Sequence, residues 1–150
     1  MLATSLTDGY GVSITFANDA YTMAVLLLDP TSITPPGVDG GEGVDNTTLS
    51  NTEVRTKSPR TLKEIVNASF TAAYDPGTYD LIVDAVNVNQ LITFTFPDGS
   101  TQAVYGFLKA FSPTGLTEGE FPTADCEIVV TNIHDTTGTE TSPVTTAASN

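Results

Sequence analysis

Histidine, cysteine and clustered carboxylates are the side chains from which this sequence could build an active site. His134 is the only histidine and Cys126 the only cysteine. His134 stands where apolar periodicity ends, which favours a packed or solvated ring over a general base. Cys126 alternates with Ala124 and Ile128 on one face of a predicted strand, which is typical of a buried, inert thiol. We therefore expect no catalytic residue and no enzymatic activity.

Three carboxylates in a glycine-rich stretch form the other candidate site. Asp39, Glu42 and Asp45 lie within seven positions of one another in the segment DGGEGVD. Such a loop could hold Ca²⁺, but its spacing lacks the alternate-residue ligands of a calcium-binding loop. No phosphate-binding glycine loop or CxxC pair is present. We expect neither a metal nor a cofactor.

A cluster of positive charge stands apart in a strongly acidic chain. The sequence has 18 acidic residues and 5 basic ones, for a net charge of −13. Four of the five basic residues are Arg55, Lys57, Arg60 and Lys63. The surrounding acidity repels phosphates and argues against ordinary DNA or RNA binding. The cluster is either a solvated charged stretch or a complement to the acidic surface of another copy, where it would steer association and set register.

The segment that carries this cluster, residues 29–64, is unusually long and poor in large apolar residues. It is rich in proline and glycine, and structureless loops beyond about 12–15 residues are uncommon in compact domains unless they are functional or disordered. Within it, residues 46–56 are compatible with a short β-ribbon. We predict an assembly loop whose polar contacts are the four basic residues and whose apolar anchors are Val44, Leu49, Val54 and Leu62.

Alternating apolar residues predict the elements that must position this loop. Strict alternation indicates half-buried strands, and an apolar stripe at helical spacing indicates an amphipathic helix. The predicted strands cover residues 12–17, 21–28, about 66–74, 88–96, about 101–111 and about 124–130. One short helix is predicted at about 77–87, with Tyr79, Ile82, Val83 and Val86 as its apolar stripe. Pro97-Asp98-Gly99-Ser100 is a turn signature between two strands.

Composition supports the same fold class. Apolar residues make up 39% and charged residues 15%, and the polar remainder is rich in Thr, Ser, Asn and Gly, which suit strands and turns. We predict a mainly β protein, a small β-sandwich or barrel with one short flanking α-helix and a long inter-strand loop. One domain is expected at 1–133, followed by a disordered Thr/Ser-rich tail at 134–150. No signal peptide is visible and the longest apolar run is too short to cross a bilayer, so synthesis in a cytoplasm is expected.

Several stretches resemble the major tail tube proteins of long-tailed, non-contractile bacteriophages. Their order and spacing over residues 10–133 carry the resemblance more than any one of them. The stretches are VDNTTL (44–49), PRTL (59–62), FTAAYD (70–75), ITFTFPDGS (92–100), YGF (105–107), FSP (111–113) and ADCEI (124–128). The chain departs from the family in its short lead before Gly11, which puts an extended N-terminal arm in doubt.

The resemblance implies a structural subunit of a virion tail, made in the cytoplasm of a host bacterium. It implies a β-sandwich with a flanking helix, assembling into hexameric rings that stack into a tube through which the genome passes. The long loop of such proteins contacts the adjoining ring. Expected partners are copies of the same chain and other tail proteins, such as the tape measure, tail tip and terminator. DNA would pass without specific binding, and no membrane is involved.

Two other classes of function are compatible with a small β protein. One is a carbohydrate-binding or adhesin-like module on a virion or cell surface, which would need a platform of exposed aromatic rings. The sequence has no Trp, and most Tyr and Phe fall on predicted core faces, which disfavours this class. The other is an enzyme, which lacks a His, Cys or metal constellation. A self-assembling tube subunit is therefore the leading hypothesis.

Overall fold

The structure is a computed structural model that describes residues 12–17, 26–28, 30–74 and 76–148. The sequence also contains a turn signal at Asn18-Asp19 and, before the predicted helix, a capping residue, Asp75. Both lie outside the described residues, as does the first part of the strand predicted at 21–28. The elements in chain order are β1 (Ser13–Ala17), β2 (Leu26–Leu28), β3 (Pro30–Thr34), β4 (Val38–Asp39), β5 (Val44–Asp45), β6 (Lys57–Ser58), β7 (Glu64–Ile65), β8 (Ala68–Ala73), a 3-10 turn (Pro76–Thr78), α1 (Tyr79–Ala85), β9 (Gln90–Thr95), β10 (Thr101–Pro113), β11 (Thr123–Val130) and β12 (Val144–Thr146).

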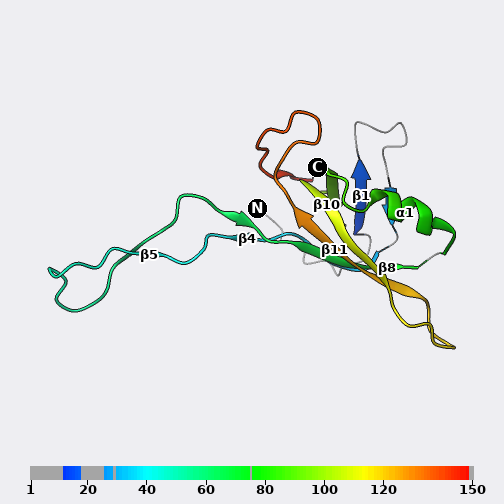
Figure 1. Ribbon diagram of the computed structural model, residues 1–150, viewed down its shortest axis with the longest axis horizontal. Helices are drawn as coiled ribbons and strands as arrows, with labels where there is room; N and C mark the ends of the chain where they lie inside the picture. The colour runs from blue at the N-terminus through cyan, green and yellow to red at the C-terminus, as the bar shows by residue number, and fades with distance from the viewer. Residues whose placement is uncertain (1–11, 18–25, 29, 75, 149–150) are drawn as a thin grey trace.

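One antiparallel sheet dominates the molecule and curls into a half-barrel (Figure 1). Seven strands run in the order β2-β1-β9-β10-β11-β8-β3, and β12 pairs with β10 beside this path. Strands β9, β10 and β11 form a meander, whereas β8 and β9 are separated in the sheet and joined through α1. The predicted mainly β class with one short helix is confirmed.

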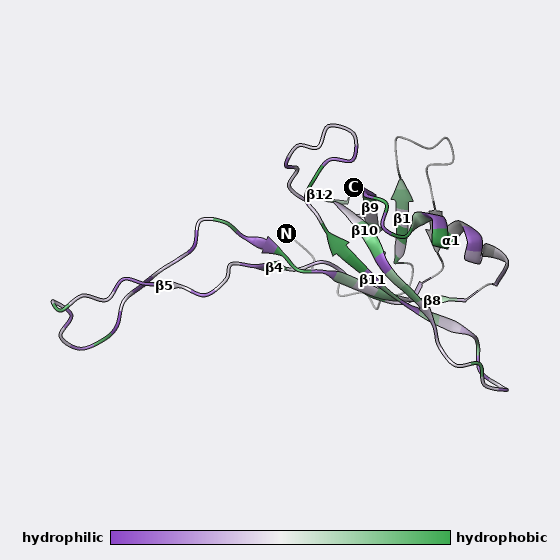
Figure 2. Ribbon diagram, in the orientation of Figure 1, coloured by the Kyte–Doolittle hydropathy of each residue, from purple (hydrophilic) through white to green (hydrophobic). Residues whose placement is uncertain are grey.

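The core lies on one face of this sheet, where alternate residues of the strands point inward. Phe16, Phe94 and Ile92 are fully buried, and Leu108 and Ile128 join them from β10 and β11. Burying an aliphatic or aromatic side chain of this size stabilises a fold by about 1.5–3 kcal/mol, so this face accounts for much of the stability of the sheet. Figure 2 shows the apolar colour concentrated on these strands.

Helix α1 covers part of the core with fewer residues than its sequence predicts. Ile82 is buried and Val86 packs against the core, but Tyr79 and Val83 are more than two-fifths exposed. The helix spans only Tyr79–Ala85, shorter than the predicted 77–87, so Val86 lies just beyond its end and its inward side is too narrow to bury Tyr79 and Val83 as well. Tyr79 instead contacts Phe111 of β10, with ring centroids 6.2 Å apart.

β10 pairs with β9 along one edge and with β11 along the other, over different parts of its length. Residues 101–106 pair with β9 and residues 106–113 with β11, while β12 pairs with residues 101–103. The chain leaves β11 at Asn132, whose φ of 57° turns it away from the sheet. The backbone N–H groups of Thr131 and Asn132 donate to Tyr105 O at 2.9 and 3.3 Å, and these bonds fix the exit.

Two segments differ from their predicted conformations. The segment predicted as a loop at 29–64 contains β3, which pairs with β8 at the sheet edge. Its first residue, Pro30, has no N–H to donate, a property tolerated at a strand start or edge. The segment predicted as a disordered tail at 134–150 contains β12, whose three side chains are all exposed. Both strands lack an inward apolar alternation, and that is why the sequence pattern missed them.

Candidate assembly surface

Residues 35–66 form a long, narrow projection from the sheet, which we call the arm (Figure 1). Pro35 and Pro36 end β3 because neither can donate a ladder hydrogen bond. The two sides of the arm then pair at its base, where Val38 lies opposite Ile65 and Val66 N donates to Gly37 O at 2.8 Å. Pro36 is buried, and Gln102 Nε2 of β10 donates to its carbonyl at 3.3 Å. The sheet therefore holds the base of the arm.

The middle of the arm is held by hydrogen bonds instead of a core. β5 pairs with β6 over Val44–Ser58 and Asp45–Lys57. Asn46 N donates to Thr56 O at 3.1 Å, next to this pairing. The ladder therefore lies just outside residues 46–56, and the short β-ribbon predicted there is not formed, because these residues contain turns and bends but no strand. Gly41, with a φ of 74°, lets the chain turn so that its N–H donates to Asp39 Oδ1 at 2.8 Å.

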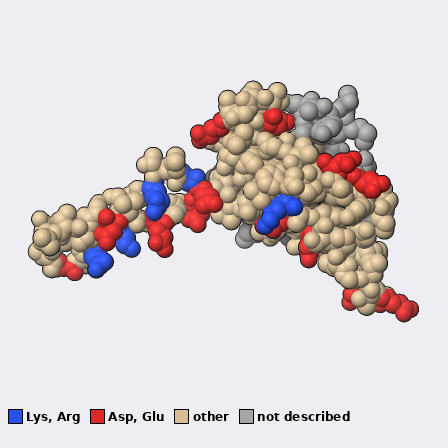
Figure 3. All heavy atoms as spheres, viewed as in Figure 1, with Lys and Arg blue, Asp and Glu red and all other residues tan. Residues whose placement is uncertain are grey.

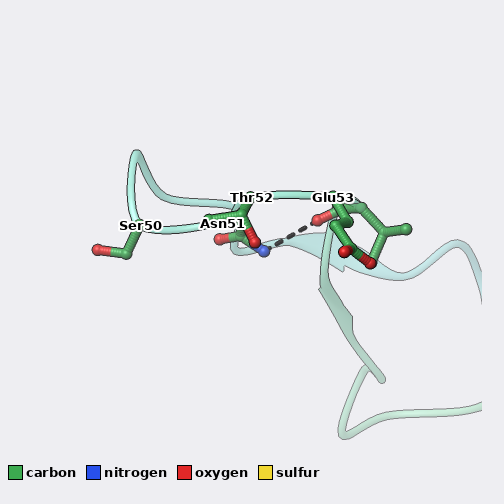
Figure 4. A pocket seen from close by; sticks show the side chains of 5 residues that line it. Ser50, Asn51, Thr52 and Glu53 are labelled. Carbon is green, nitrogen blue, oxygen red and sulfur yellow. Dashed lines mark hydrogen bonds between the residues drawn. The ribbon is translucent and has the colours of Figure 1, made fainter.

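The end of the arm is a compact polar turn. Asn51 N donates to Thr48 O at 3.1 Å, and Asn51 Oδ1 accepts from Thr48 N at 2.9 Å. The Asn51 amide Nδ2 also donates to Val54 O at 3.0 Å, the bond drawn in Figure 4. These contacts surround a shallow hollow lined by residues 50–54. Asn51 thus stabilises the turn from both sides.

All four predicted apolar anchors lie on the arm and are exposed. Val44 is half exposed and Val54 more so, while Leu49 and Leu62 are 106% and 82% exposed. The arm is thin, and a two-stranded ribbon has no interior in which to bury them. The arm therefore presents these four apolar side chains to solvent.

The four predicted basic residues also lie on the arm but do not form a uniform positive patch. Acidic and basic residues alternate over the arm in Figure 3. Arg55 lies 3.8 Å from Asp45 across the ribbon, with both side chains largely exposed, so this pair contributes little to stability. Arg60 Nε donates to Glu42 O at 2.8 Å. Hydrogen bonds from Thr47 lower the pKa of the Asp45 carboxyl.

The two lysines of the cluster are the exception. Within the described residues, neither Lys57 nor Lys63 has a carboxylate within ion-pair distance, and both are exposed. Lys109, the remaining basic residue, pairs with Glu127 at 3.3 Å on the sheet. Lys57 and Lys63 are therefore the ammonium groups available to a partner.

The residues considered for chemistry lie in different surroundings. Cys126 is buried in the core, and this burial, aided by the charge of Asp125, raises the pKa of its thiol to about 12. The His134 ring packs against the Tyr105 ring, with centroids 4.8 Å apart and planes tilted by 39°, and His134 Nδ1 lies 3.3 Å from Asp135 Oδ1. No group of three or more His, Cys, Asp or Glu that could hold a metal occurs in the part of the chain the structure describes. Asp39 and Asp45 instead accept hydrogen bonds from nearby backbone N–H groups.

A second exposed apolar site was not predicted. The loop between β10 and β11, residues 114–122, carries Leu116 and Phe121, which are 74% and 93% exposed. The sequence signal was available, because both stand in a Gly/Pro-rich connection where no core strand passes.

Within the described residues, no helix has the length and apolarity needed to cross a membrane.

Comparison with known proteins identifies the fold of this chain by its likeness to solved structures. No protein-family model matches the sequence, and no curated protein matches it. Among solved structures, the chain has the fold of subunits from six-fold symmetric tail and baseplate particles. One is a chain in the cryo-EM structure of the anti-feeding prophage (AFP) baseplate, 6-fold symmetrised, with a TM-score of 0.63 and 9% identity over 87% of this chain and 94% of that one.

Another is a chain in the tail of an empty GTA particle with C6 symmetry. Its TM-score is 0.55 at 9% identity, covering 83% of this chain and 94% of that one. At 9% identity both likenesses concern the fold. They extend over nearly the full length of each neighbour, so this chain and its neighbours share a whole domain architecture.

Proposed function

We propose that the chain is a structural subunit of a phage-type tail, located in the virion. Copies of it assemble into six-fold rings, and the rings stack into a tube that conducts a genome. The arm carries this proposal, because it exposes apolar side chains and unpaired lysines on an element that has no core of its own. Support also comes from the two fold neighbours, whose particles are a baseplate and a tail with six-fold symmetry.

Self-association explains two structural features that a monomeric binding module does not require. A projecting ribbon and a sheet with strands β2 and β3 at its edges both offer surfaces that another copy can cover. The net charge of −13 suits a wall along which DNA moves without adhering, because like charges repel. Other tail proteins, such as a tape measure, a tail tip and a terminator, would complete the assembly.

Electron microscopy of the purified full-length chain tests this proposal. Negative-stain images should show rings or tubes. A chain that stays monomeric at high protein concentration, in both low and high salt, would contradict it.

Charge reversal tests the part of the arm in the assembly. Changing Arg55, Lys57, Arg60 and Lys63 to glutamate should leave the sheet folded, because all four side chains are exposed, and should impair stacking. Lys109→Glu is the control outside the arm. Tubes of normal length from the four-residue variant would show that the charges of the arm are dispensable.

A further inference from the structure

The molecule has a second projection, which points away from the arm. This is the hairpin end formed by residues 114–122 between β10 and β11, seen at the opposite end of the molecule from the arm in Figure 1. Thr114 N donates to Thr123 O at 2.9 Å and Glu120 N to Thr117 O at 3.2 Å. The first bond closes the base of the hairpin end and the second closes a turn within it.

The composition of the hairpin end is apolar and acidic. Leu116 and Phe121 are its large exposed side chains. Glu118 and Glu120 are also exposed, and residues 114–122 contain no basic residue. Acidic side chains are accordingly seen at this extremity in Figure 3. Neither glutamate has an ion-pair partner among the described residues.

The arm offers the complementary set of groups. Its exposed leucines, Leu49 and Leu62, match the apolar pair of the hairpin end, and Lys57 and Lys63 match the two glutamates. The arm also carries carboxylates, at Asp39, Glu42, Asp45, Glu53 and Glu64. Asp45 faces Arg55, and no carboxylate of the described residues lies within ion-pair distance of Lys57 or Lys63. Apolar contact between the two surfaces would supply affinity, and the charge pairs would set the register.

We propose that the hairpin end of one copy docks on the arm of another. This inference rests on the proposed self-assembly and names the surface that receives the arm. The two projections lie at opposite ends of the molecule, so one copy presents both halves of the contact to different neighbours. Such a contact is heterologous, and its repetition extends an assembly instead of closing a two-fold dimer.

A charge swap tests the contact. At about 0.15 M salt, where repulsion between the net charges is screened, the variant E118K/E120K should assemble less than the wild type, and so should K57E/K63E. Two exposed ion pairs correspond to about tenfold in an association constant, so the concentration needed for tubes should rise by about that factor in each variant. The chain that carries all four substitutions should recover assembly, because the two pairs are then restored with reversed signs.

The matched control is D80K/D84K, which makes the same charge change at two exposed positions of α1. Phe121→Ser tests the apolar half of the contact and should also raise the concentration needed for tubes. Sedimentation and negative-stain microscopy measure all variants against the wild type. Assembly of E118K/E120K equal to that of D80K/D84K, or no recovery in the four-residue swap, would overturn the docking while leaving the proposed function standing. A wild type that forms no assembly would instead refute the proposed function, and the docking with it.

Discussion

Gly106 shows how a single residue constrains the sheet. It lies at the position where the ladder with β9 on one edge of β10 ends and the ladder with β11 on the other edge begins. A Cβ atom built on Gly106 would collide with the backbone carbonyl oxygen of Val129. The colliding atom belongs to a paired strand and has little freedom to move. The close approach of β10 and β11 therefore requires glycine at this point.

Gly106→Ala should destabilise the protein by about 1–3 kcal/mol, the usual cost of forcing extra volume into a packed site. Urea unfolding followed by circular dichroism measures the difference. The control is Gly115→Ala, because a Cβ there has no atom within 4 Å, and its effect should stay within about 0.5 kcal/mol. Equal stability of the two variants would mean that β10 and β11 can move apart to accept a Cβ atom at residue 106 with no loss in the free energy of unfolding.

Cys126 gives a second prediction at this scale. With its pKa raised from 9.0 to about 12, the folded state keeps its thiol protonated where the unfolded state would lose the proton. The neutral thiol therefore contributes stability below pH 9 that is lost as pH rises from about 9 to about 12. Reaction of the native protein with a thiol reagent at pH 8 should be far slower than that of the urea-unfolded chain. Equal rates would show that the thiol is accessible.

The elements predicted correctly are those in which one face of a strand is buried. In β1, β8, β9 and β11 the buried residues alternate, and burial is what makes a period of two visible in a sequence. β12 leaves all three side chains exposed, so its pairing depends on backbone hydrogen bonds that any residues could make. The same holds for the two-residue ladders of the arm.

The candidate assembly surface is visible in the sequence only as a cluster of charge, and its role in assembly stays a prediction. Clustering of charge is visible in a sequence, and the arm carries Arg55, Lys57, Arg60 and Lys63 as predicted. The cross-ribbon contacts of Arg55 with Asp45 and of Arg60 with the Glu42 carbonyl depend on how the two sides of the arm align. That alignment is set by pairing in three dimensions and not by spacing along the chain.

The arm and the sheet should be separable elements. Asp39 and Glu64 lie directly opposite each other in the ladder of β4 and β7, so residues 40–63 can be replaced by a two-residue Asn-Gly turn. No buried core residue lies in the removed stretch. The free energy of unfolding should therefore change by less than about 1 kcal/mol, whereas rings or tubes should be lost.

Urea unfolding and negative-stain microscopy of this shortened chain measure the two effects. Full-length protein treated in parallel is the control. A large loss of stability would show that the arm supports the sheet. Tubes of ordinary length would show that stacking uses other surfaces.

At the scale of the whole molecule, charge opposes the association that the apolar surfaces favour. Each copy carries −13, and two such charges about 40 Å apart in salt-free water repel by roughly 17 kcal/mol. A Debye length of about 8 Å at 0.15 M salt removes most of this repulsion. Exposed ion pairs, each worth at most about 1 kcal/mol, cannot offset the unscreened term.

Assembly of the wild type should therefore increase as salt is raised from low to physiological concentration, because screening removes long-range repulsion before it weakens close contacts. Light scattering and sedimentation across a sodium chloride series measure this dependence. The variant D80K/D84K makes the net charge less negative at positions away from both projections, and it should need less salt to reach the same degree of assembly. A steady fall in wild-type assembly with added salt would instead mean that attraction between opposite charges dominates over the net repulsion. The hairpin end and the arm would then owe more of their affinity to Glu118, Glu120, Lys57 and Lys63 than to exposed apolar side chains.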